Sequence, residues 1–236
     1  MNTNSKPVAA VVGVGPGNGA AIARAFSRAG YAVALLARHT TFTAPLAAQL
    51  HDAQAIACDV TDAASVMDAF ASIESGLGSV DTLVFNAGSG VWGSIEEIEA
   101  DVFEANWRIN ALGLFACAKR VIPPMKAKGT GNILVVGATA SRRGGAKTAA
   151  FAAAKAAQRS LAESMARQLG PAGIHVAMVI IDGVVDLPNT RKNMPDKPDD
   201  FFVKPDAVAA NLLWLARQDR SAWSFEIEAR PFGEKW

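Results

Sequence analysis

Four glycines stand close together near the start of the chain, in Gly13-Val-Gly-Pro-Gly-Asn-Gly19. Glycines permit a tight turn and let backbone N–H groups approach a pyrophosphate, and a following helix N-terminus adds positive partial charge. Two spacings fit: Gly15, Gly17 and Ala20 match G-x-G-x-x-A, and Gly13, Gly17 and Gly19 match G-x-x-x-G-x-G. An ordinary turn between a strand and a helix is the alternative. The predicted phosphate-binding residues are Gly13, Gly15, Gly17, Asn18 and Gly19.

The next apolar run ends about 20 residues past the glycines, at Leu35-Leu-Ala-Arg-His39. A dinucleotide site for NAD usually has a carboxylate here, which accepts a hydrogen bond from the ribose 2′-OH. This chain has none, whereas Arg38 offers a guanidinium that can pair with a 2′-phosphate. The sequence therefore favours NADP(H) over NAD(H), with a solvated arginine at a strand end as the alternative.

These residues are positioned by apolar runs that alternate with helical patterns along the whole chain. Continuous runs rich in Val and Ile are typical of parallel strands covered on both faces. The predicted strands are Val8–Val12, Ala32–Leu36, Ala53–Cys58, Val80–Phe85, Asn132–Val136, His175–Ile181 and Phe225–Ala229. The predicted helices are Gly17–Ala29, Thr43–Leu50, Asp62–Glu74, Ile95–Lys126, Thr148–Leu169 and Pro205–Ala216. The alternation predicts one α/β domain over residues 1–236, a doubly wound parallel sheet of about seven strands with helices on both faces.

Two segments fall outside this alternation. Residues 1–6 are polar and are predicted to be a flexible N-terminus. Residues 186–200 contain three prolines and many charged side chains, which predicts a mobile flap over a substrate site. An ordered surface loop is the alternative for this second segment.

Composition excludes several classes of protein. The 236 residues carry 23 Lys and Arg against 22 Asp and Glu, a net charge of +1, and half of them are hydrophobic. The chain is too apolar to be disordered, and its net charge is too small to indicate a protein that binds nucleic acid. Two isolated cysteines, Cys58 and Cys117, favour a reduced, cytoplasmic protein. Neither a membrane-spanning segment nor a metal site is expected.

Six segments, in order and at family spacing, together resemble the short-chain dehydrogenase/reductase family. They are Gly13-x-x-x-Gly17-x-Gly19, Cys58-Asp-Val60, Phe85-Asn-Ala-Gly88, Trp107-Arg-Ile-Asn-Ala111, Phe151-Ala-Ala-Ala-Lys155 and Gly170-Pro-Ala-Gly-Ile-His-Val176. The resemblance covers about residues 7–185. It implies a Rossmann-type fold, a nicotinamide cofactor and an oxidoreductase.

The resemblance also assigns roles to residues. It implies that Asp59 and Val60 meet the adenine, that Asn110 and Lys155 belong to the catalytic tetrad, and that Lys155 binds the nicotinamide ribose. The remaining cofactor-binding residues that it implies are Asn86, Ala87, Gly88 and Gly183.

Two catalytic positions depart from the family pattern. The family's proton-donating tyrosine stands four residues before the lysine, where this chain has Phe151, and its only tyrosine is Tyr31. The family's serine lies thirteen residues earlier, where this chain has Ala138. Loss of a positioned acid lowers a rate by roughly 10²–10⁴-fold, and loss of a donor to the developing oxyanion by roughly 10²–10³-fold. Ordinary turnover of alcohols and ketones should therefore be poor.

Three hypotheses follow. The first is an oxidoreductase with an altered proton path, in which Asn110 and Lys155 hold a water or another hydroxyl donates. The second is a catalytically impaired NADP(H)-binding regulator or partner subunit, and the third is a structural homologue with no cofactor. The first is favoured, because Asn110 and Lys155 belong to the nicotinamide end of the site. The alternative hydroxyls are Ser89, Thr139 and Ser141.

The substrate is predicted to be a small molecule of unresolved polarity. Trp92 and Phe201 indicate an apolar substrate, whereas a group of cations indicates an acidic one. These cations are Arg142, Arg143, Arg191 and Lys192. Small side chains crowd the helix Thr148–Leu169, which predicts close helix packing in a homodimer or homotetramer. Packing of this helix onto its own sheet is the alternative.

Overall fold

The computed structural model describes residues 6–233 of the chain. Seven parallel strands form the main sheet in the order β3-β2-β1-β4-β5-β6-β9. They are β1 (Val8–Val12), β2 (Ala32–Ala37), β3 (Ala53–Ala57), β4 (Val80–Phe85), β5 (Gly131–Ala138), β6 (Ile174–Ile181) and β9 (Glu226–Ala229). The predicted doubly wound, Rossmann-type α/β sheet is confirmed.

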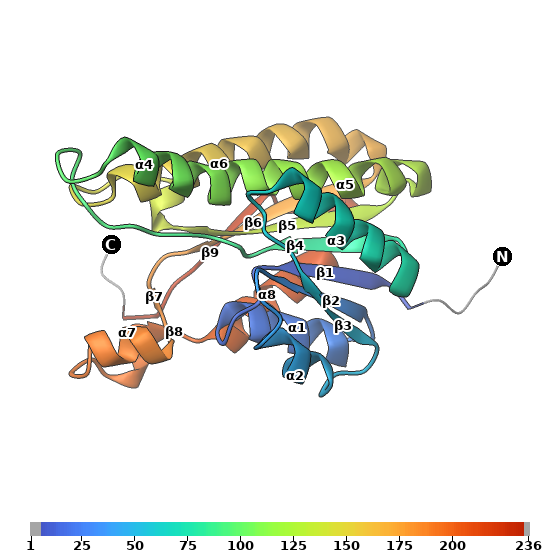
Figure 1. The fold of residues 1–236 in the computed structure, drawn as a ribbon, viewed down its shortest axis with the longest axis horizontal. Helices are drawn as coiled ribbons and strands as arrows, with labels where there is room; N and C mark the ends of the chain where they lie inside the picture. Colours follow the sequence, from blue (N-terminus) through green and yellow to red (C-terminus); the bar gives the residue numbers. More distant parts are fainter. Residues whose placement is uncertain (1–5, 234–236) are drawn as a thin grey trace.

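Helices cover both faces of this sheet (Figure 1). On one face lie α3 (Ala63–Gly76), α4 (Ala100–Trp107), α5 (Gly113–Lys128) and α6 (Ala149–Leu169). On the other lie α1 (Asn18–Arg28), α2 (Thr43–Ala47) and α8 (Pro205–Ala216). No helix in residues 6–233 is long and apolar enough to cross a membrane.

Each face of the sheet has its own apolar layer. In β1, Ala10 and Val12 pack in the layer under α3, α5 and α6, while Ala9 and Val11 pack in the layer under α1 and α8. All four side chains are almost fully buried. Burial on both faces explains why most of the strands appear in the sequence as apolar runs rather than alternating ones.

The order of strands reverses between β1 and β4. The chain runs outward from β1 to β2 and β3 on one side, and from β4 to β5, β6 and β9 on the other. Loops leaving the carboxyl ends of β1 and β4 therefore diverge and leave a crevice, which is where open α/β sheets bind their ligands.

The predicted helix Ile95–Lys126 is wrong at its start and in its middle. The helix begins only at Ala100, because the preceding segment pairs with the loop before α6: Gly93 N donates to Lys147 O at 2.9 Å. A π-helical turn, Arg108–Leu112, then separates α4 from α5. The predicted Thr43–Leu50 is likewise shorter, ending at Ala47.

The segment predicted as a flap contains regular structure. Strands β7 (Val184–Val185) and β8 (Phe202–Val203) pair in parallel and enclose α7 (Pro188–Asn193), and together they project beyond the main sheet (Figure 1). Arg191 joins Asp186 at 2.7 Å and Asp199 at 2.7 Å, and lies 4.1 Å from the centre of the Phe202 ring. These contacts favour an ordered surface segment. The predicted flexible N-terminus lies outside the described residues except for Lys6.

Candidate functional site

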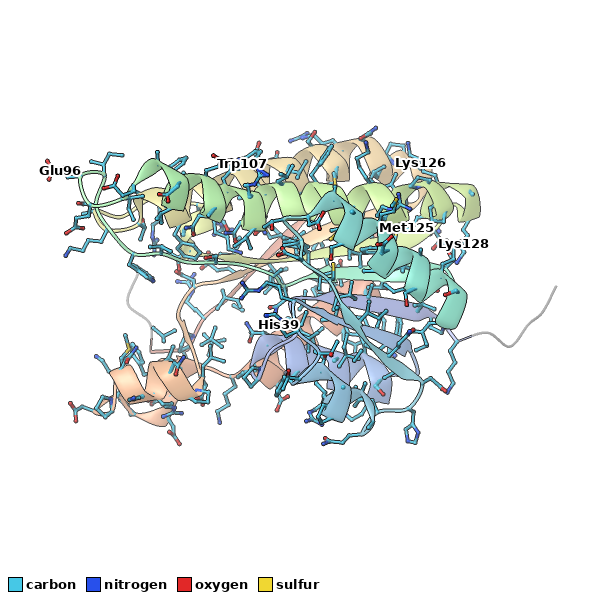
Figure 2. The ribbon with its side chains drawn as sticks, viewed as in Figure 1. His39, Glu96, Trp107, Met125, Lys126 and Lys128 are labelled. Atoms are coloured by element: carbon cyan, nitrogen blue, oxygen red, sulfur yellow. The ribbon has the colours of Figure 1, made fainter. Side chains whose placement is uncertain are left out.

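A cavity of about 840 Å³ opens at the crevice between β1 and β4. It lies beside the glycine loop, the carboxyl ends of β2, β3 and β4, and the end of α4 with its π turn. Its lining includes Gly13, Gly15, Arg38, His39, Asp59, Val60, Asn86, Ala87, Gly88, Ser89, Arg108 and Ile109. Figure 2 shows His39 near the middle of the molecule, between the two helix layers. Most of the predicted cofactor-binding residues are thus brought together.

The start of the glycine loop is fixed by close backbone packing. Gly13 has φ +89°, and a Cβ there would lie 2.4 Å from Ala87 N. A Cβ on Gly19 would lie 2.6 Å from Val14 Cα. The Asn86 side chain donates from Nδ2 to Gly13 O at 2.7 Å, which joins the loop after β4 to the loop after β1. Glycine is therefore required at both positions for steric reasons.

The rest of the glycine loop borders a second cavity of about 430 Å³. A Cβ on Gly15 would meet no atom within 4 Å, so the backbone here is open to a ligand. Asn18 Oδ1 is buried without a hydrogen-bond partner among the described residues. Leu187, just before α7, reaches this loop, and its Cδ2 lies 2.2 Å from where a Gly17 Cβ would be.

Polar groups on the other side of the large cavity carry opposite charges. Asp59 accepts from the backbone N–H and the hydroxyl of Thr61, at 2.9 and 2.7 Å, and these hydrogen bonds lower the pKa of its carboxyl. Arg38 is exposed at the end of β2 and forms no ion pair with any residue in 6–233. A charged acceptor and an unpaired guanidinium therefore face the same cavity.

Lys155 is buried beneath the loop that follows β4. Its side chain comes from α6 and is only 6% exposed, and its Nζ donates to Val136 O and to Gln158 Oε1, both at 3.0 Å. Neither acceptor is charged, so burial lowers the pKa of Lys155 to about 8. The ammonium group has a third N–H that neither acceptor uses.

Asn110 lies in the π turn and points at the same place. Its Nδ2 donates to Ser89 O at 3.0 Å and to Asn106 O at 2.9 Å, while its Oδ1 is buried without a partner among the described residues. A Cβ built on Gly88 would lie 3.2 Å from Asn110 Oδ1 and 3.6 Å from Lys155 Nζ. The space beside Gly88 therefore has an acceptor and a donor directed at it.

Comparison with known proteins gives the family of this chain. A family model described as short chain dehydrogenase matches residues 7–198. The chain belongs to the short-chain dehydrogenase/reductase family. It is 34% identical over 182 residues to 2-(S)-hydroxypropyl-CoM dehydrogenase 3 of Xanthobacter autotrophicus (strain ATCC BAA-1158 / Py2), covering 75% of this chain and 71% of the relative.

Two further relatives match nearly the whole chain. The cyclic-di-GMP-binding biofilm dispersal mediator protein of Escherichia coli (strain K12) is 31% identical over 219 residues, 89% of this chain and 90% of the relative. The crystal structure of an alcohol dehydrogenase from the archaeon Thermococcus sibiricus, complexed with 5-hydroxy-NADP, superposes with a TM-score of 0.88 at 27% identity. That superposition covers 98% of this chain and 99% of the neighbour.

Phe151 stands at the position where the family resemblance implies a tyrosine. The Phe151 ring packs against Trp92, with 6.0 Å between ring centres, and lies 3.4 Å from where a Gly90 Cβ would be. Trp92 is 70% exposed, so this apolar pair stands open to water. Ala138 offers only its backbone, whose N–H donates to Ser141 Oγ at 3.1 Å.

The three alternative hydroxyls lie in different surroundings. Ser141 Oγ accepts a hydrogen bond from Ala138 N, and Thr139 donates from Oγ1 to Asp182 Oδ1 at 2.5 Å. Ser89 alone of the three lines the large cavity. The structure therefore leaves Ser89 as the hydroxyl best placed to reach a bound molecule.

Most of the predicted substrate-binding cations already have partners. Arg142 pairs with Glu226 and Glu228, and Arg143 lies 3.5 Å from Asp182. Gly183 lines neither cavity: a Cβ there would lie 2.7 Å from Pro231 Cδ. Among residues 6–233, no three His, Cys, Asp or Glu side chains group as metal ligands.

Two contacts of the site were not predicted from the sequence. Gln158 bridges Lys155 and the π turn, and Leu187 covers Gly17. A glutamine three residues after the lysine on one helix face is a signal that the sequence carries. The Leu187 contact depends on where the whole 184–203 segment folds, and no local pattern predicts it.

Proposed function

We propose that this protein binds NADP(H) along the crevice, with the adenosine half in the large cavity and the nicotinamide ribose beside Gly88. The observation that carries the proposal is the pair of groups at Gly88. Asn110 Oδ1 is an acceptor without a partner, and Lys155 Nζ has an unused N–H. A ribose hydroxyl both donates and accepts, so it suits this pair of groups.

The other half of the site fits the same molecule. The open backbone at Gly15 lies beside the N-terminus of α1, which favours phosphate. Asp59 offers an acceptor for an amino group, and Arg38 offers a charge for a 2′-phosphate. The neighbour from T. sibiricus, complexed with 5-hydroxy-NADP, supports a choice of NADP(H) over NAD(H).

The reaction proposed is hydride transfer to or from a small carbonyl, alcohol or activated C=C compound by an altered proton path. NADPH, when bound, supplies the hydride. The reduced substrate then needs one proton, which Phe151 and Ala138 cannot give. Trp92, which packs on Phe151, is exposed to solvent, so water can approach this end. A substrate that forms a stabilised anion can take its proton from that water.

The surroundings favour an apolar substrate. Trp92 and Phe151 supply aromatic surface, whereas Arg142 and Arg191 are already paired with carboxylates. An acidic substrate would have to displace these pairs, which removes the advantage of the cations.

A second candidate function is a catalytically impaired NADP(H)-binding regulator or partner subunit. The absent tyrosine and serine favour it, and the E. coli relative is described by its ligand and its mediator role. Both candidates require NADP(H) binding, so turnover distinguishes them.

Titration with NADPH and NADH, followed by tryptophan fluorescence, tests the binding shared by both candidates. Micromolar NADPH affinity, clearly tighter than for NADH, is the expected result, and no binding of either contradicts the proposal. Protein with bound NADPH is then mixed with small apolar enones and activated ketones. The oxidoreductase is supported if one of these compounds causes consumption of NADPH and the Lys155→Met variant does not consume it. The regulator is supported if NADPH stays unaltered with every compound.

We also propose that the protein forms a homodimer or homotetramer through the helix layer of α4, α5 and α6. Phe103, Trp107 and Phe115 are each more than 40% exposed on α4 and α5, and Figure 2 shows Trp107 on this layer. Exposed aromatic side chains in a group indicate a contact surface. A monomeric mass by light scattering at micromolar concentration would contradict this assembly.

A further inference from the structure

Gln158 occupies the centre of the buried polar group beneath Gly88. It lies on α6, one turn after Lys155, and its side chain is fully buried. Its Oε1 accepts from Lys155 Nζ at 3.0 Å, and its Nε2 donates to Asn110 O at 2.9 Å. One amide therefore joins the two residues that direct groups at Gly88.

We propose that Gln158 is a positioning residue, which holds the Lys155 ammonium and the Asn110 π turn in place for the nicotinamide ribose. This inference rests on the proposed binding of NADP(H). Gln158 itself does not reach the space beside Gly88. It acts through Lys155 and Asn110, whose free donor and free acceptor are fixed relative to one another by its amide.

The polarity of the amide allows only this arrangement. Lys155 is a donor and Asn110 O is an acceptor, so the residue between them must accept at one end and donate at the other. Leucine at 158 would leave both groups short of a partner in a buried place. A carboxylate at 158 would keep the bond to Lys155 but lose the donor to Asn110 O.

The charge state of Lys155 decides whether a donor remains for the ribose. A neutral amine has two N–H groups, and Val136 O and Gln158 Oε1 occupy two. Only the ammonium form has a third. The groups around Nζ are neutral on every element: the Val136 carbonyl on β5, the Gln158 amide on α6, the Asn110 amide in the π turn and the backbone of Gly88. NADPH affinity should therefore fall as pH rises above about 8.

The test compares two probes on the purified protein by tryptophan fluorescence, from about pH 7 to about pH 10. NADPH spans both ends of the site. Adenosine 2′,5′-bisphosphate occupies only the adenosine end and does not reach Lys155. The ratio of the two affinities isolates the contribution of the nicotinamide end, and circular dichroism checks that each variant folds.

Gln158→Leu is expected to lower NADPH affinity about tenfold at pH 7 and to leave bisphosphate affinity unchanged. Gln158→Glu puts a carboxylate beside Lys155 Nζ, which raises the pKa of the lysine. The loss of NADPH affinity at alkaline pH should then move up by about one pH unit or more. This second variant decides the question if Gln158→Leu does not fold.

Gln218→Leu is the matched control. Gln218 also makes two amide hydrogen bonds, accepting from Ser224 N at 2.8 Å and donating to Ser224 Oγ at 2.9 Å, and it lines neither cofactor cavity. Its replacement should leave the ratio of affinities unchanged.

The positioning role is overturned if Gln158→Leu changes the two affinities equally or not at all, or if Gln158→Glu keeps the wild-type pH profile. Failure of the proposed function looks different, because the wild-type protein would then bind NADPH no better than the bisphosphate at any pH.

Discussion

The two ends of the crevice are built in different ways. At the proposed adenosine end, the positions of groups are set by backbone packing: Gly13, in the loop after β1, touches the backbone of Ala87, in the loop after β4, and has no room for a side chain. At the proposed nicotinamide end, these positions are set by side chains, through Lys155, Gln158 and Asn110. The first end keeps the family pattern of residues, and the second departs from it at Phe151 and Ala138.

The difference separates binding from chemistry. Backbone N–H groups and a helix N-terminus can hold a phosphate whatever happens at the far end of the crevice. Proton transfer requires a particular side chain at a particular place, and changing that side chain leaves the backbone frame intact. Under the proposed function, the protein can therefore lose or change its reaction while it keeps the proposed cofactor site.

Restoring the acid at the nicotinamide end should have the largest effect. Phe151→Tyr combined with Ala138→Ser supplies a proton donor and an oxyanion donor on an existing frame. Reduction of simple ketones by NADPH is expected to rise by roughly 10²–10⁴-fold over wild type. The measurement is steady-state NADPH consumption, and Phe151→Leu, which has no hydroxyl, is the matched control. If the double variant gains nothing, the two ends differ in more than the missing acid.

Arg38→Ala tests the adenosine end alone. The loss of a guanidinium contact to the 2′-phosphate should weaken NADPH binding about 10- to 100-fold and leave NADH binding unchanged. Fluorescence titration of both cofactors gives the two affinities. Arg24→Ala is a suitable control, because Arg24 is an arginine of α1 that bonds Gln49 and lines neither cavity. An equal loss of affinity for NADPH and NADH would show that Arg38 does not bind the 2′-phosphate.

Two glycines of one loop should respond to alanine in opposite ways. At Gly13 the new Cβ meets Ala87 N at 2.4 Å with φ +89°, so Gly13→Ala should lower the free energy of unfolding by about 1–3 kcal/mol. At Gly15 the new Cβ meets nothing, so Gly15→Ala should leave stability unchanged. Its methyl group would stand where a pyrophosphate approaches, so NADPH affinity should fall about tenfold. Thermal unfolding and titration of both variants measure these effects. Unchanged NADPH affinity in Gly15→Ala would contradict a ligand site at Gly15.

The sequence predicts most of the fold because burial on both faces leaves a plain signal. All seven strands of the main sheet are predicted within one or two residues of their observed ends, since most are largely apolar runs between turns. The start of α4 is not predictable in this way. Residues 95–99 suit a helix by composition, but the pairing of Gly93 with the loop before α6 holds the chain away from one.

The residues of the site likewise fall into those that local sequence motifs predict and those that they do not. Gly13, Asp59 and Asn86 belong to local motifs, and all three line the large cavity. Gln158 and Leu187 act through contacts between distant segments, with the π turn and with the glycine loop. The mobility predicted for residues 186–200 stays a prediction, and the ion pairs from Arg191 to Asp186 and Asp199 join the two ends of that segment.

The smallest expected effect is on the free energy of unfolding, which burial of the charged form of Lys155 lowers by an amount that depends on pH. Its pKa is about 8 in the folded protein and about 10.5 in an unfolded chain. Between these values the unfolded state binds more protons, so the free energy of unfolding rises with pH; below about 8 the cost is fully present. Lys155→Met abolishes this dependence. Wild type should therefore gain about 1 kcal/mol of stability relative to the variant from pH 8 to pH 9.

Denaturant unfolding of both proteins at each pH measures this gain, and the adenosine end supplies the internal control. Asp59→Asn removes a carboxyl whose pKa is lowered by the hydrogen bonds from Thr61. A lowered carboxyl pKa stabilises the fold above the unfolded pKa, and this contribution is lost only as pH falls toward acid values. The stability difference between wild type and Asp59→Asn should therefore stay constant from pH 8 to pH 9. The buried charge of Lys155 is not the source of the dependence if the stability difference between wild type and Lys155→Met stays constant from pH 8 to pH 9, or if the difference between wild type and Asp59→Asn changes over that range.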